Sequence, residues 1–163
     1  MSGTKFRMVE TAFEREARRP GGKRVSECLV EAHANLEVLA PRTLPRFQEG
    51  LDRIRTIVGN GRDRPSDEHL KHIFRIADGL IAYCLTVNRP GLDQVLLRTA
   101  LLSDAVYGSD LWIPGTFAPL IETFQLTLDG SLELPQVSIL IENIDLCIAR
   151  YKKAERDAVM IDA

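Results

Sequence analysis

The sequence predicts an all-α fold, an antiparallel helical bundle with a four-helix core and extra helices at its N- or C-terminal end. Apolar residues recur along most of the chain at the three- and four-residue spacing of amphipathic helices. Prolines and glycines divide this pattern into segments of helix length joined by short turns, which is typical of antiparallel neighbours. The 163 residues, 45% of them hydrophobic, suffice for one domain with a buried core.

The first two expected helices precede residue 59. Ser26 is a favourable N-cap for a helix that Pro41 is expected to end, because proline lacks the N–H that a helix uses. The second helix carries an apolar stripe from Leu44 to Val58. It is expected to stop at the Gly59-Asn60-Gly61 turn, since glycine accepts the positive φ of a helix end.

Two more helices are expected between residues 66 and 107. Ser66 is the predicted N-cap of the third, which should end near Asn88, before Pro90. The fourth should run from about Pro90 to Tyr107. The apolar stripe of the third helix, which we expect to be buried, comprises Leu70, Ile73, Phe74, Ala77, Ile81 and Cys84.

The last two helices are expected at 116–128 and 136–153. Pro119 lies in the first turn of the fifth, where its missing N–H does no harm. The stretch 131–141 has enough β-branched residues to leave a strand open, but Pro135 suits a helix start better than a strand centre. The bundle domain is therefore expected to cover 25–155, followed by a tail at 156–163.

Residues 1–24 are expected to form a basic N-terminal arm or a short helix. They contain seven Lys or Arg and three Glu, a charge of +4, so the net charge of −2 for the whole chain leaves −6 for the rest. Such an arm could bind nucleic acid or another anionic surface. A solvated terminus is the more common role of such a segment.

The remaining composition predicts a soluble protein of a reducing cytoplasm. No run of about 18 apolar residues is present, and the N-terminus lacks the apolar core of a secretory signal. The three cysteines, Cys28, Cys84 and Cys147, are far apart and form no CxxC pair. Each lies in an apolar helical context, so we expect buried thiols that act as small hydrophobes.

The sequence offers no self-contained catalytic site. The three histidines, His33, His69 and His72, do not lie beside a nucleophile in any recognised pattern. His69 and His72 share a helix face and could be two metal ligands, but no third ligand is evident. No glycine-rich phosphate loop is present. We therefore expect no catalysis by this chain alone, no metal and no cofactor.

One central stretch, FRIADGLIAYCLTVNRPGL from Phe74 to Leu92, resembles the histidine-phosphotransfer (Hpt) domains of bacterial phosphorelays. In one form of that family the segment reads Arg-Ile/Val-Ala-His-Asp-Ile/Met-Lys-Gly and continues to Phe-Gly-Tyr-Pro. Arg75-Ile76-Ala77 fits its start, and Val87-Asn88-Arg89-Pro90 falls at its end without gaps. The similarity of pattern covers about 26–130, and the family fold that it implies is an antiparallel helical bundle.

The departures from the family pattern fall on its functional positions. Asp78 stands where the resemblance places the phospho-accepting histidine, Ile81 where it places a lysine, and Ala82 where it places a glycine. In the family, the histidine attacks the aspartyl phosphate of a receiver domain. A carboxylate cannot replace the imidazole, and it would be repelled by the acidic pocket of the receiver unless a divalent ion bridged them. The resemblance therefore implies that the relay chemistry has been lost.

His72 leaves a second interpretation open. It precedes Arg75 by three residues, so His72-Ile73-Phe74-Arg75 is similar to a His-x-x-Lys arrangement with Arg in place of Lys. The offset from Asp78 spoils the rest of the family pattern, and Ile76 occupies the position of the small residue. An exposed histidine without a catalytic role is the more common outcome at such a position.

These observations predict a degenerate Hpt-like adaptor that acts by binding a receiver domain or a histidine kinase. The expected contact surface is the solvent side of the third helix around Arg75, Asp78, Gly79 and Ala82, where small residues allow close approach. The same strip could instead support a homodimer. The alternatives are an active phosphotransfer protein that uses His72, and a structural or nucleic-acid-associated protein that uses the basic arm.

Overall fold

The computed structural model describes residues 24–161, and all regular elements in this range are helices. They are α2 (Val25–Val58), α3 (Asp67–Ile81), the 3₁₀ helix η1 (Cys84–Thr86), α4 (Leu92–Tyr107), α5 (Ala118–Leu128) and α6 (Leu134–Ile161). The prediction of an all-α helical bundle is confirmed. The strand alternative at 131–141 is wrong, because α6 begins at Leu134 and continues through this stretch.

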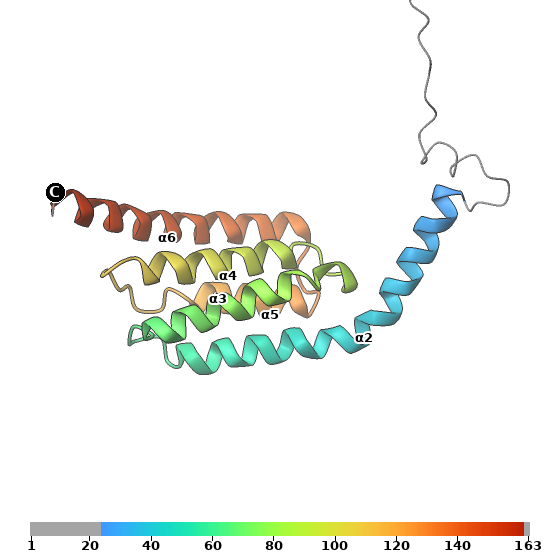
Figure 1. Cartoon of the computed structure of the whole chain (residues 1–163), viewed down its shortest axis with the longest axis horizontal. Coiled ribbons are helices and arrows are strands. Elements are labelled where there is room, and N and C mark those ends of the chain that lie inside the picture. The colour runs from blue at the N-terminus through green and yellow to red at the C-terminus, as the bar shows by residue number, and fades with distance from the viewer. Residues whose placement is uncertain (1–23, 162–163) are drawn as a thin grey trace, which may run out of the picture. The chain divides into compact units, whose positions relative to one another are not determined.

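The chain divides into two units, Met1–Asn35 and Leu36–Ala163. In the described part of the first unit, residues from Val25 onward form the beginning of α2. The second unit contains the rest of α2 and all the other helices. Within it, α4 is the central helix, because it packs against α3, α5 and α6 (Figure 1).

A continuous apolar core fills the second unit. Its largest fully buried side chains are aromatic and come from different helices and loops: Phe47, Phe117, Phe124 and Tyr151. The hydroxyl oxygen of Tyr151 on α6 accepts a hydrogen bond from the backbone N–H of Ile113 at 3.0 Å. This bond gives the one polar atom of a fully buried ring a partner and attaches the loop before α5 to α6.

The prediction that Pro41 ends a helix is wrong. A single helix, α2, runs through both Pro41 and Pro45. Each proline removes one helical hydrogen bond, but the apolar pattern keeps its phase across both of them. The side chains on this stripe are half-buried or buried from the start of the second unit onward: Leu36, Ala40, Thr43, Phe47, Leu51, Ile54 and Val58. Burial of this stripe holds the helix continuous where local propensity predicted a break.

The third helix is shorter than predicted. Ser66 is its N-cap, as expected, and its side chain accepts a hydrogen bond from the N–H of His69 at 3.3 Å. The helix ends at Ile81 rather than near Asn88, and the chain tightens into η1 before Val87, which is buried. Gly91 then begins the next helix with φ of +83°, and a Cβ there would lie 2.7 Å from Cγ1 of Val137 on α6. The chain needs glycine here for both its conformation and its closeness to α6.

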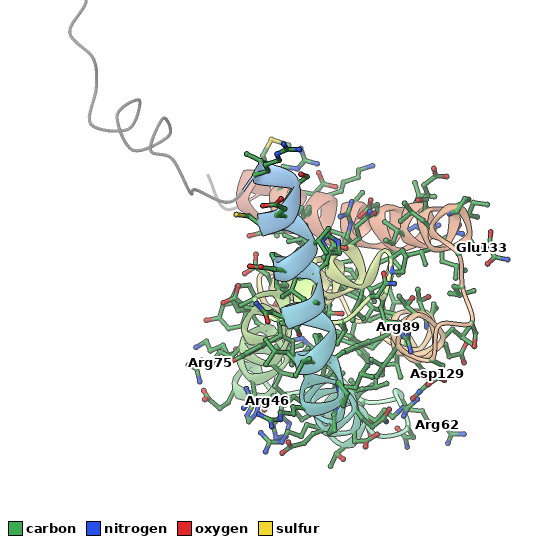
Figure 2. All side chains as sticks on the ribbon, turned by 90° about the vertical axis from the view of Figure 1, so that its right-hand side faces the viewer. Arg46, Arg62, Arg75, Arg89, Asp129 and Glu133 are labelled. Carbon is green, nitrogen blue, oxygen red and sulfur yellow. The ribbon has the colours of Figure 1, made fainter. Side chains whose placement is uncertain are left out.

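The prolines at the last two helices lie where the sequence predicted. Pro119 is in the first turn of α5, and Pro135 is the second residue of α6. At the C-terminal end of α5, Arg89 donates from Nε to the carbonyl oxygen of Leu128 at 2.6 Å, close to Asp129 (Figure 2). Arg89 therefore supplies a partner for a carbonyl at the end of α5 that the helix itself leaves free.

The expectation of three buried cysteines is wrong for Cys28, which is exposed. It lies in the first unit on a turn of α2 where Val25 and Leu29 are exposed as well. Cys84 and Cys147 are half-buried. Burial and the negative charge of Asp93 raise the pKa of Cys84 to about 12, so its thiol stays protonated at neutral pH.

Candidate functional site

The orientation of α3 follows from its apolar positions. Leu70, Ile73, Ala77 and Leu80 are buried and lie on one side of the helix. The opposite side faces solvent, and it carries three of the residues that the sequence analysis selected. Phe74, which was expected on the buried stripe, lies at its edge and is 38% exposed.

The four selected residues Arg75, Asp78, Gly79 and Ala82, here called the α3 face, are all exposed. Ala82 follows the last helical residue, but its φ of −59° and ψ of −22° continue the helical turn. A Cβ added to Gly79 would have no heavy atom within 4 Å. The middle of the α3 face is therefore open, and Gly79 borders a small hollow of about 170 Å³ against α2, so the backbone of another molecule can approach it closely.

The two charged residues of the α3 face differ in their pairing. Arg75 lies 3.9 Å from Glu68, but both side chains are largely exposed, at 70% and 77%, so the attraction is weak. Asp78 makes no hydrogen bond or ion pair with any described residue. Ile81, at the position of the family's lysine, is half-buried against the core and brings no positive charge toward Asp78.

A groove of about 810 Å³ separates α3 from α2. His69 and His72 line one side of it and both are exposed. The opposite wall is formed by α2, where the apolar residues Pro45 and Ile57 alternate with polar groups. These polar groups pair along the helix: Gln48 donates to Asp52 at 3.0 Å, and Arg53 donates to Glu49 at 2.6 Å. Arg46, farther along α2, lies 5.2 Å from the centre of the Tyr83 ring. Figure 2 shows Arg46 and Arg75 projecting outward from the bundle.

A second groove, of about 300 Å³, lies on the other side of α3, against α4. Its walls include the rings of Phe74 and Tyr107, and the ammonium of Lys71 lies 4.9 Å from the centre of the Tyr107 ring. Arg75 reaches this groove as well, so it belongs both to the groove and to the α3 face. Lys71 and Tyr107 were not among the site residues predicted from the sequence. The sequence shows that Lys71 lies four residues before Arg75 and that Tyr107 lies at the end of the fourth helix. It does not show that the third and fourth helices bring these two residues together.

Two further findings concern metal binding and membrane spans in the described residues. Within residues 24–161 no group of three or more His, Cys, Asp or Glu side chains could hold a metal ion, so His69 and His72 have no third ligand there. None of the helices in the same range is long and apolar enough to cross a membrane. No protein-family model, curated protein or solved structure matches this chain.

Proposed function

We propose that this chain is a degenerate Hpt-like bundle that binds a receiver domain or a histidine kinase through the α3 face, without transferring phosphate. The single observation that carries the proposal is the exposure of Arg75, Asp78, Gly79 and Ala82 together on one side of α3. These are the residues aligned with the functional segment of the family. A surface with an open glycine and a small alanine suits the close approach of another folded protein.

The chemistry of Asp78 favours binding over phosphotransfer. A phosphorylated carboxylate is an acyl phosphate, and forming one requires a metal held by several acidic groups near the accepting oxygen. Asp78 has no such group of described neighbours. Its free carboxylate is instead available to hydrogen-bond donors or cations of a partner.

Isothermal titration against the receiver domains and histidine kinases of the host tests the proposal. Ala82→Arg places a long charged side chain on the α3 face and should abolish binding. Ala149→Arg is the matched control, because Ala149 is exposed on α6, away from this face. Binding that survives Ala82→Arg, or the absence of binding to every receiver and kinase, would show the proposal to be wrong.

Phosphotransfer through His72 is the second candidate. The observation in its favour is that His72 is exposed at the edge of the α2–α3 groove, where a partner can reach its imidazole. A relay assay with labelled ATP separates the two proposals. Acid-labile, base-stable label that is lost in His72→Ala but kept in His69→Ala would establish a working relay. Slower transfer from kinase to receiver, with no label on this protein, would support the binding role.

The remaining alternatives stay predictions. The basic arm of residues 1–24 lies outside the described residues, apart from Arg24. Salt-sensitive retention on DNA that disappears when residues 1–24 are deleted would identify a nucleic-acid-associated role. A homodimer through the α3 face would appear as a doubled mass in light scattering that Ala82→Arg returns to a monomer.

A further inference from the structure

The N-terminal part of α2 carries an apolar stripe that is largely exposed. Its members recur at spacings that alternate between four and three residues: Val25, Leu29, Ala32, Leu36 and Leu39. Val25 is 77% exposed, Leu29 is 58% exposed and Leu39 is 42% exposed. Ala32 is exposed as well, and Leu36 is half-buried. Because this alternation is the pattern by which one helix packs its apolar side against another, most of the stripe is free to pack against a helix of another molecule.

The residues beside the stripe suit a second helix of the same sequence. At 3.6 residues per turn, the positions that border it between residues 25 and 35 hold no Lys, Arg, Asp or Glu: Ser26 and His33 on one side, Cys28 and Asn35 on the other. The acids of this stretch, Glu27 and Glu31, lie on the opposite side of the helix. When such a surface faces a copy of itself, no like charges meet at the edges of the contact.

The distribution of charge along the chain favours an antiparallel pair of copies. Residues 1–24 carry a charge of +4, and residues 25–163 carry −6. In an antiparallel pair centred on Ala32, Val25 of one copy lies beside Leu39 of the other. Each basic segment then begins next to the acidic part of the other copy, whereas a parallel pair would bring the two basic segments together. The small side chain of Ala32 at the centre also lets the two helices approach closely.

We propose that two copies of this chain form an antiparallel homodimer through the α2 stripe, the five apolar residues between Val25 and Leu39, with Ala32 at the two-fold axis. The same surface is used by both copies, so the assembly closes as a dimer. The α2 stripe shares no residue with the α3 face, so this proposal goes beyond the proposed function and does not depend on it. The stripe spans about two heptads, fewer than a long-lived coiled coil needs, and we expect a dissociation constant on the order of 10 µM.

Sedimentation equilibrium of the full chain between about 1 and 200 µM tests the dimer. The mass of the unaltered protein should rise from that of one chain to twice that value. Leu29→Glu places a charge in the α2 stripe and should raise the dissociation constant about tenfold or more. Val30→Glu is the matched control, because Val30 is 69% exposed but lies off the stripe, and its effect should stay below about twofold. Equal thermal melting by circular dichroism shows that both variants are folded.

Three results of that experiment would overturn the proposal. The first is a monomer at every concentration, and the second is an equal effect of Leu29→Glu and Val30→Glu. The third is a dimer that Ala82→Arg dissociates and Leu29→Glu leaves intact, because such a dimer lies at the α3 face.

Disulfide cross-linking in a Cys28→Ser background tests the antiparallel direction. An oxidised mixture of Val25→Cys and Leu39→Cys chains should form a covalent dimer of one chain of each kind. Val25→Cys alone should form none, because its two copies would lie about 21 Å apart along the helix axes, beyond the reach of a disulfide. Cross-linking of Val25→Cys alone, without the mixed product, would show a parallel pair and overturn the stated arrangement.

Discussion

Arg98 on α4 holds Asp145 on α6 through two parallel hydrogen bonds. Its Nε donates to Oδ1 at 3.1 Å, and its Nη2 donates to Oδ2 at 3.2 Å. The Arg98 side chain is 24% exposed and that of Asp145 is 46% exposed. Paired donors fix the geometry of the contact, so this ion pair sets the register between the two helices more strongly than a single surface contact would.

Replacing Arg98 with alanine should lower the free energy of unfolding by about 1 kcal/mol, because the pair is bidentate but only partly shielded from solvent. Denaturant unfolding of Arg98→Ala, Asp145→Ala and the double variant measures the coupling as a double-mutant cycle. The exposed pair of Arg53 with Glu49 is the control, and its coupling should be near a few tenths of a kcal/mol. Equal coupling in the two pairs would contradict a special role for the bidentate contact.

Replacing Gly91 or Gly79 with alanine should change the stability of the protein in opposite directions. Gly91→Ala should destabilise the protein by about 1–3 kcal/mol, because alanine disfavours φ of +83° and its Cβ would press on Val137. Gly79→Ala should stabilise it by about 0.5–1 kcal/mol, since Gly79 is inside α3 and its surroundings are open. Thermal melts of the two variants compare them directly, and a stabilised Gly91→Ala would be incompatible with the packing of α6 described above.

Tyr151→Phe should lower the free energy of unfolding by about 1–2 kcal/mol. The ring still fills its buried site, but the N–H of Ile113 loses the acceptor that now lies 3.0 Å away. Urea unfolding measures the change. Tyr83→Phe is the control, because Tyr83 is partly exposed, and its stability should stay within about 0.5 kcal/mol of the unaltered protein.

Cys84 should react much more slowly with thiol reagents at pH 8 than Cys28. The reactive species is the thiolate, and burial together with Asp93 raises the pKa of Cys84 from 9.0 to about 12. Cys28 is exposed and should be labelled first. Mass spectrometry after brief labelling with iodoacetamide identifies the order, and prior labelling of Cys84 would contradict it.

The same shift makes stability depend on pH. The folded protein keeps the Cys84 proton above pH 9, where the unfolded chain releases it, so the contribution of this group to stability is full below pH 9 and is lost as pH rises toward about 12. Cys84→Ala should remove the part of the stability loss at alkaline pH that comes from this thiol. Urea unfolding of both proteins between pH 8 and pH 10.5 tests it, and parallel curves would show that Cys84 does not titrate in this way.

Local signals predicted most of the helix starts. Ser66, Pro119 and Pro135 each lie where their chemistry favours a helix beginning, and each is found there. The prediction that a helix ends at Pro41 was wrong for a tertiary reason. Burial of the apolar stripe of α2 that includes Phe47 outweighs the local penalty of a proline. The end of α3 could not be predicted from the sequence either, because the burial of Val87 after a tight turn depends on the neighbouring helices.

The candidate site was predictable only in part. Helical periodicity alone places Arg75 and Asp78 away from the buried side of α3, and both are exposed. The two grooves depend on which helix lies on each side of α3, and no residue type in the sequence encodes that. Phe74 illustrates the limit: an apolar residue next to Ile73 reads as core, but it lies at the boundary with solvent because the buried stripe is narrower than the apolar pattern.

The loops at one end of the second unit connect parts of the chain that are far apart in sequence. Trp112 donates from Nε1 to the carbonyl of Arg62 at 2.8 Å, across 50 residues, and Arg64 donates to the carbonyl of Val106 at 3.1 Å, across 42 residues. The N–H of Gly115 adds a bond to the carbonyl of Gly61 at 2.8 Å. During folding, α3 and α4 can pair early because a short turn joins them, whereas these loop bonds must wait until long intervening segments are ordered. We therefore expect these hydrogen bonds between the 59–66 and 108–117 loops to form after α3 and α4 have paired, and the unfolding rate of the bundle to be sensitive to their removal.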